Sequence, residues 1–254
     1  MDAARLDSLS KVPQVTLIFW IIKILATTLG ETGGDMVSMS MNLGYLIGTG
    51  IFAAIFVLAV IVQIRAKQFH PFLYWLTIIA TTTVGTTLAD FFDRSLGIGY
   101  AGGASILFVL LMASLLTWRW STGTVSVESI STLKAEMFYW GTIMFSQTLG
   151  TALGDWVADD VGLGLGYAGA AAVFGGILVI VIALYFWTNV SRTILFWTAF
   201  IVTRPLGAVV GDFLDKPIAN GGLALSRYTA SILLLVFIVA FILIFPPKAT
   251  DEVH

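Results

Sequence analysis

Four aspartates recur at the same place in a repeated phrase of an otherwise apolar chain. One copy of the phrase, T-L-G-T-A-L-G-D, covers residues 148–155, and its aspartate follows two glycines set four apart. The four aspartates are Asp35, Asp90, Asp155 and Asp212. Carboxylates in apolar surroundings are rare unless they face a cavity or a partner. Four at one level would repel one another, so we expect a proton, a Lys or Arg side chain, or an external cation among them.

Positions one and two turns before each aspartate lie on the same helical face and carry further oxygen atoms. Carboxylate, hydroxyl and amide oxygens are the ligands that Mg²⁺, Ca²⁺ and Mn²⁺ prefer. We therefore predict a cation site whose metal ligands are the carboxylates of Glu31, Asp35, Asp90, Asp155 and Asp212. The oxygen-bearing neighbours predicted to complete this site are Thr28, Thr83, Thr86, Thr148, Thr151 and Gln147.

Two basic residues in the repeated phrases are candidate counter-ions. Arg204 lies seven residues after Trp197, so it is about 10 Å into its helix. There it could neutralise the acids until a substrate cation displaces it. Lys23 lies only three residues after Trp20, and it either plays the same part or extends to the near membrane surface. The acids expected in a solvated mouth beyond the site are Asp93, Asp159, Asp160 and Asp215.

The elements that position these residues are long apolar helices. Apolar residue types make up 58% of the 254 residues, and charged types make up 11%, where a soluble domain typically carries about 25%. Residues 171–188 and 229–247 contain no charge, and runs of about 18 or more such residues are typical of membrane-spanning helices. The sequence therefore predicts an all-α polytopic membrane protein.

Internal repetition sets the number of helices. Residues 20–35, 75–90, 140–155 and 197–212 align without gaps, and each has Trp first, Gly ten residues later and Asp fifteen residues later. A Gly-rich stretch and a second apolar run follow each phrase, so each repeat is predicted to be a helical hairpin. We expect eight helices in four parallel repeats, arranged with pseudo-fourfold symmetry or as two pseudo-twofold halves, within one membrane domain over residues 1–254. The predicted repeats are 15–66, 70–120, 135–188 and 192–246, with a solvated cytosolic loop at 119–136.

Small residues four apart are the common signature of close helix packing in lipid. The glycines predicted to bring the first helices of the repeats together are Gly30, Gly34, Gly85, Gly150, Gly154, Gly207 and Gly211. The tryptophan that opens each phrase is expected in the aromatic belt at the membrane surface. Eight of the eleven Lys and Arg residues near helix ends lie on the side that holds both termini, which predicts cytoplasmic termini and aspartates in the outer half.

The composition excludes several classes of function. The chain has no cysteine and two histidines, so thiolate and multi-histidine metal sites are excluded. Its net charge of −2 gives no indication of nucleic-acid binding, and it contains no phosphate-binding loop for an ATP-driven pump. An intramembrane aspartyl protease needs two aspartates rather than a fourfold repetition, so we expect no enzyme and no cofactor beyond a bound cation.

These observations favour a transporter for a small cation, a divalent ion such as Mn²⁺ or Mg²⁺ exchanged for protons. A cation channel with an acidic ring and a structural or sensory membrane protein are the alternatives, and homo-oligomerisation is left open. The Trp-to-Asp phrases over residues 15–246 resemble a bacterial family of integral membrane proteins built from four copies of a hydrophobic repeat of unknown function. The resemblance implies a bacterial cytoplasmic (inner) membrane protein and carries no activity.

Overall fold

The computed structural model describes residues 10–130 and 132–250, and this part of the chain is all-α. It contains no β-strand, only one isolated bridge between Pro13 and Ala249 that brings the two ends of the described chain together. The long helices are α2 (Leu17–Asp35), α3 (Gly44–Arg65), α4 (Pro71–Asp90), α5 (Tyr100–Thr122), α6 (Leu133–Ala158), α7 (Gly166–Trp187), α8 (Arg192–Asp215) and α9 (Arg227–Ile244). The predicted eight helices are confirmed.

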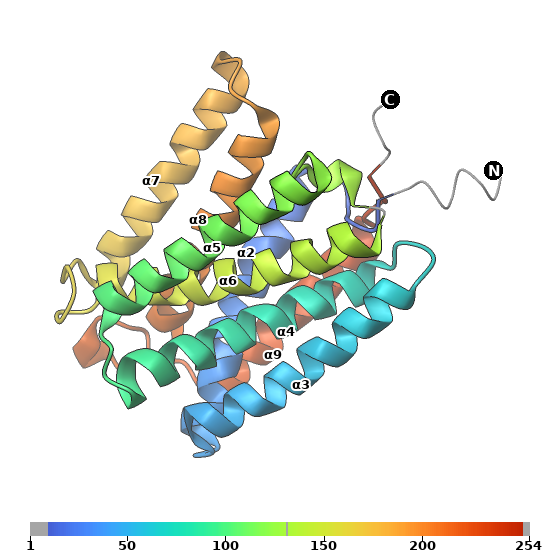
Figure 1. The fold of residues 1–254 in the computed structure, drawn as a ribbon. Coiled ribbons are helices and arrows are strands. Elements are labelled where there is room, and N and C mark those ends of the chain that lie inside the picture. The colour runs from blue at the N-terminus through green and yellow to red at the C-terminus, as the bar shows by residue number, and fades with distance from the viewer. Residues whose placement is uncertain (1–9, 131, 251–254) are drawn as a thin grey trace.

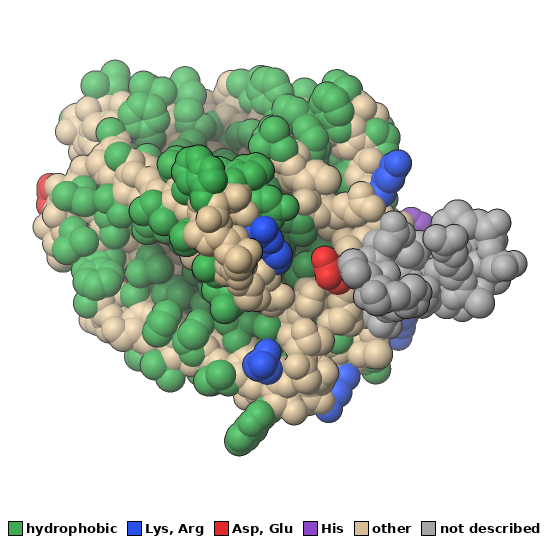
Figure 2. Space-filling model, turned by 90° about the horizontal axis from the view of Figure 1, so that it is seen from above, with side chains coloured by type: hydrophobic (Ala, Val, Ile, Leu, Met, Phe, Trp, Pro, Cys, Tyr) green, Lys and Arg blue, Asp and Glu red, His purple; other side chains and the backbone are tan. Residues whose placement is uncertain are grey.

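Seven of these helices are long and apolar enough to cross a membrane, which confirms the polytopic membrane class. The other, α6, is 26 residues long and carries buried polar side chains such as Gln147 along its middle. In α2, α4 and α8, 67–72% of the apolar stretch is buried, against 11–28% in α3, α5, α7 and α9. The first helix of each repeat is therefore internal and the second faces outward, and hydrophobic side chains are spread widely over the face in Figure 2.

The contacts among the four inner helices close a ring, within the bundle that Figure 1 shows from the side. Helix α2 packs on α4, α4 on α6, α6 on α8, and α8 again on α2. The outer helices contradict the hairpin expectation, because α3 packs on α4, α5 on α6, α7 on α8 and α9 on α2. Each second helix thus lies on the first helix of the next repeat, and the arrangement is pseudo-fourfold.

Glycines set the close approach inside the ring. A Cβ added at Gly85 would lie 2.8 Å from the backbone carbon of Gln147 on the next inner helix. The same contact, from the first glycine of one phrase to the residue eight before the aspartate of the next, recurs around the ring. Its other pairs are Gly30 with Thr82, Gly150 with Arg204, and Gly207 with Thr27. The last pair joins the fourth repeat to the first and closes the ring.

The end of the bundle near the termini is filled with aromatic side chains. Tyr74 and Tyr139 share a hydrogen bond of 2.6 Å between their hydroxyls. Trp75, Trp140 and Trp197 are buried against their neighbours in the same cluster. The expectation of a lipid-facing belt is wrong for these three residues, because the ring of inner helices turns them toward one another.

The connector between α5 and α6 is shorter and more buried than predicted. Helix α5 runs to Thr122 and α6 begins at Leu133, so the loop spans residues 123–132 rather than 119–136. Ile130 is buried in the core, and the Trp197 indole donates a hydrogen bond of 2.9 Å to the carbonyl of Val125. The loop closes over the aromatic end of the ring instead of lying free in solvent.

Two inner helices end in π-helical turns directly after their aspartates. Met36–Ser40 continues α2 and Phe91–Ser95 continues α4, whereas α6 and α8 stay α-helical past their aspartates. π-Helical turns are rare in proteins, and those that occur are often found at functional sites. They place the residues that follow the first two aspartates over the end of the ring.

Candidate site of acidic and basic side chains

The four repeated aspartates lie at the end of the ring opposite the aromatic cluster. All four are buried, with between 1% and 4% of each residue exposed. Each ends or nearly ends its inner helix, where the pseudo-fourfold arrangement places equivalent residues around one axis. The structure therefore brings the acids together, as the repeated phrase suggested.

Two basic side chains each bridge a pair of these aspartates from different repeats. The Arg94 Nε atom lies 2.9 Å from Asp90 Oδ1, and its Nη2 atom lies 3.4 Å from Asp155 Oδ2. The Lys216 Nζ atom lies 2.9 Å from Asp212 Oδ1 and also contacts Asp35 Oδ2. All four acids thus have a positive partner within the protein.

Lys216 keeps its charge in this setting. Burial lowers the pKa of its amine, but the carboxylates of Asp212, Asp35 and Asp215 raise the pKa by more than burial lowers it. The pKa therefore lies well above its ordinary value. Arg227 adds a second positive charge, with its Nε atom 2.7 Å from Asp215 Oδ2 and 3.7 Å from Asp35 Oδ2. The prediction of Asp215 as a solvated mouth residue is therefore wrong, because this ion pair holds it in the buried cluster.

Two groups of acids are compact enough to share a metal ion. Ligand atoms of Glu31, Asp35 and Asp90 lie within 4.8 Å of one another, and so do those of Asp35, Asp212 and Asp215. Asp35 belongs to both groups, whereas Asp155 belongs to neither. The five carboxylates predicted as metal ligands are therefore not equivalent.

Arg204 spans the inside of the ring one turn below the aspartates. It is fully buried, and its Nη1 and Nη2 atoms each lie 3.2 Å from Glu31 Oε2. Its Nη2 atom also donates to the hydroxyls of Thr86, at 2.6 Å, and Thr151. The predicted counter-ion is thus paired with Glu31, and it is hydrogen-bonded to two of the five threonines that were predicted as cation ligands.

The other predicted oxygen ligands are placed differently. Thr28, Thr83 and Thr148 donate to carbonyls of their own helices, at distances of 2.8–2.9 Å. Gln147 is fully buried, and neither atom of its amide has a hydrogen-bond partner in residues 10–130 and 132–250. The hydroxyls of these three threonines are thus used within their own helices, whereas the predicted ligand Gln147 has an amide free to bind a cation.

Lys23 does not extend to the membrane surface. It is fully buried, and its Nζ atom lies 4.1 Å from the centre of the Phe200 ring. No ion pair or hydrogen bond to this amine is found in the described part of the chain. Its contact with an aromatic face is a cation–π interaction, and it lies away from the acids rather than acting as their counter-ion.

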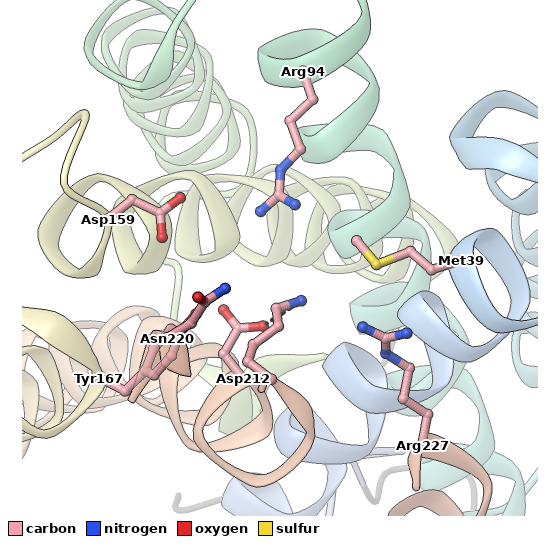
Figure 3. A pocket seen from close by; sticks show the side chains of 8 residues that line it. Met39, Arg94, Asp159, Tyr167, Asp212, Asn220 and Arg227 are labelled. Carbon is pink, nitrogen blue, oxygen red and sulfur yellow. Dashed lines mark ion pairs between the residues drawn. The ribbon is translucent and has the colours of Figure 1, made fainter. Parts of the chain in front are cut away.

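A cavity of about 290 Å³ opens above the aspartates (Figure 3). Four of its lining residues are the fourth residues after the four aspartates, namely Met39, Arg94, Asp159 and Lys216. In the sequence, Arg94, Lys216 and Arg227 are the three basic residues on the side away from the termini, and their place in the site was not predicted. The spacing of four residues from Asp90 to Arg94 and from Asp212 to Lys216 was the signal that could have found two of them.

The fold and the site define a polytopic helical membrane protein with fourfold internal repetition and a buried acid–base cluster. The chain belongs to the family described as Repeat of Unknown Function (DUF347), whose model matches residues 18–69, 73–124, 138–191 and 195–245. The four matched segments follow the predicted repeats, and the predicted resemblance is confirmed. Comparisons with curated proteins and with solved structures gave no match.

Proposed function

We propose that this protein is a membrane transporter for a small divalent cation, which binds among the clustered carboxylates. The observation that carries the proposal is the charge of the cluster. Six buried carboxylates (Glu31, Asp35, Asp90, Asp155, Asp212 and Asp215) face four bases, Arg94, Arg204, Lys216 and Arg227. Fully ionised, the cluster has two negative charges in excess, and one divalent cation balances them.

The bridging bases Arg94 and Lys216 each keep one acid when a cation enters, and Arg204 stays beside Glu31. A cation held by Glu31, Asp35 and Asp90 takes one acid from each bridged pair. Arg94 then keeps Asp155, and Lys216 keeps Asp212. Because an unpaired buried charge is strongly unfavourable, this exchange of partners lowers the cost of opening the cluster.

A transporter fits the path below the cluster better than a channel does. Arg204 crosses the axis directly beneath the acids, and the hydrogen-bonded Tyr74 and Tyr139 lie in the aromatic cluster at the far end. A cation in the cluster is thus reached from the cavity end alone, as expected of one state of an alternating-access cycle. A channel would need a continuous pore past both obstacles.

The proposed setting is the bacterial inner membrane, with both termini in the cytoplasm. The bias of Lys and Arg toward the terminal side supports this orientation. The cavity above the aspartates would then open to the outer face. Accessibility labelling in intact cells of single cysteines introduced at exposed Arg65 and at Asp160 tests the assignment, since only the second should react with an impermeant reagent.

Binding is tested by thermal unfolding of the purified protein in detergent with Mn²⁺, Mg²⁺ or Ca²⁺. We expect Asp35→Asn to abolish stabilisation by the metal, because Asp35 belongs to both acid groups. Asp155→Asn should weaken binding about tenfold by leaving Arg94 without a second partner, as a change near but outside the metal ligands typically does. Arg94→Gln added to Asp155→Asn should restore much of the affinity, because it returns the excess to two negative charges.

Exposed Glu128, at the terminal end, supplies the matched control Glu128→Gln. The proposal fails if no divalent cation stabilises the wild type, or if Asp35→Asn binds as the wild type does. Flux of the binding ion into proteoliposomes then separates the classes. A transporter saturates and is slow, a channel gives single-channel currents, and a structural or sensory protein gives neither.

A further inference from the structure

Residues 10–14, which precede the first helix, lie against the aromatic end of the ring. Ser10 is buried, and only 1% of Val12 is exposed. Val12 belongs to the same apolar cluster as Tyr74 and Tyr139, whose hydroxyls meet at this end. This segment, here called the terminal lid, therefore closes the end of the ring opposite the four aspartates.

The terminal lid is an extended segment that lies between two others. On one side the Gln14 amide donates a hydrogen bond of 2.9 Å to the carbonyl of Lys248, which follows α9. On the other side the Ser10 hydroxyl donates at 2.9 Å to the carbonyl of Val127, in the loop between α5 and α6. The inner helices are instead packed along their length by the glycine contacts. Segments with fewer contacts open more readily than packed helices, so the lid is the part of this seal that opens first.

One ion pair joins the terminal lid to the third repeat. The Lys11 Nζ atom lies 2.7 Å from Glu136 Oε1, and it also donates a hydrogen bond of 2.9 Å to the carbonyl of Ile64, near the end of α3. Glu136 lies in the first turn of α6, and 2% of the residue is exposed. Lys11 thus links the first repeat to the third, and lifting the lid releases a contact between the two halves of the chain.

We propose that the terminal lid opens as a unit, with the ion pair between Lys11 and Glu136 as its latch. Lys11 already reaches solvent, and Glu136 lies at the end of its helix. Opening therefore returns both charges to water, and neither is left buried without a partner, which would be strongly unfavourable. A cation that enters from the cavity has to leave past this end, so the lid is the inner gate of an alternating-access cycle. That role rests on the proposed transport, whereas the opening itself does not.

Labelling of single cysteines tests the lid, because the chain has no cysteine of its own. Val12→Cys places a reporter in the lid, and Val84→Cys places one in α4, where the valine is also 1% exposed. The full chain in detergent is treated with a water-soluble maleimide. We expect Glu136→Gln to speed labelling at position 12 about tenfold, as loss of a hydrogen bond to a charged group typically does, and to leave position 84 unchanged. Glu128→Gln, which removes an exposed acid at the same end, should change neither rate.

The two reporters distinguish a lid from a general loss of stability. If Glu136→Gln speeds labelling at both positions alike, the change loosens the whole protein and the proposal is wrong. The proposal is equally wrong if labelling at position 12 is no faster. Should Glu136→Gln fail to fold, Lys11→Met removes the other partner of the ion pair, and the same comparison decides.

Cross-linking tests the lid as a gate. Lys11→Cys combined with Glu136→Cys, joined by a cleavable bifunctional maleimide, holds the lid shut, and Lys11→Cys alone controls for the reagent. The locked protein should still bind the cation, read by thermal unfolding, because the cavity end stays open. Flux into proteoliposomes should stop and should return when the link is cleaved. Undiminished flux would mean that the cation does not pass the lid. If the unlocked protein neither binds nor moves a divalent cation, the proposed function has failed, and the labelling rates still decide whether the lid opens.

Discussion

Removing either Glu31 or Arg204 alone should destabilise the protein at least as much as removing both partners of this ion pair together. Arg204 is fully buried, and 3% of Glu31 is exposed. Loss of one partner of such a pair costs about 3–5 kcal/mol, because the other charge stays buried without compensation. We expect that cost for Glu31→Gln and for Arg204→Met separately. The double variant should lose no more than one single variant, because Thr86 can still donate to the carbonyl of Gly30 at 3.2 Å.

The assay is equilibrium unfolding in mixed micelles with increasing SDS, followed by the fluorescence of the eight tryptophans. A chelator removes divalent cations, so that stability is measured without metal binding. The double-mutant cycle should give a coupling of at least about 3 kcal/mol, at or above the upper end for residues in contact. If the two single losses add to within about 0.5 kcal/mol, Glu31 and Arg204 do not act as a pair and the account of the cluster is wrong.

Two further predictions use the same unfolding assay. Gly85→Ala should lower the free energy of unfolding by about 1–3 kcal/mol, because its new Cβ would lie 2.8 Å from the backbone of Gln147. The control is Gly33→Ala, whose Cβ would meet nothing within 4 Å. That change should raise the free energy of unfolding by up to about 1 kcal/mol through helix propensity. Lys23→Met should stabilise the protein by about 1 kcal/mol, because it removes a buried amine without an ion pair; a loss of stability would mean that the Phe200 ring satisfies this charge.

The sequence predicted the parts of the fold that repetition makes visible. Four phrases in one register specify four equivalent inner helices, and the spacing of glycines specifies their close faces. The aspartates could be placed at one level because each follows its tryptophan by the same fifteen residues. Their convergence follows from symmetry, since equivalent residues on a closed ring face one axis.

The sequence could not predict which helices would pair across repeats. Both α2, in the same repeat, and α4, in the next one, offer an apolar face to α3, and the periodicity of apolar residues does not distinguish the two. The tryptophans were misplaced for a related reason. A tryptophan in the lipid-facing belt and a buried tryptophan can occupy the same position along a helix. They differ in the direction in which the side chain leaves the helix axis, and for Trp75 and Trp140 this direction is inward.

The symmetric ring carries asymmetric chemistry, and that asymmetry supports transport over a purely structural role. The residue four before the aspartate is Glu31 in one repeat and Ala208 in another, and the residue four after it is a base in only two repeats, at Arg94 and Lys216. A structural core would be stabilised by full neutralisation, yet the buried cluster has more acids than bases. Each bridging base holds two acids, so each can release one and stay paired. A cluster built in this way is suited to accept a cation and to give it up again.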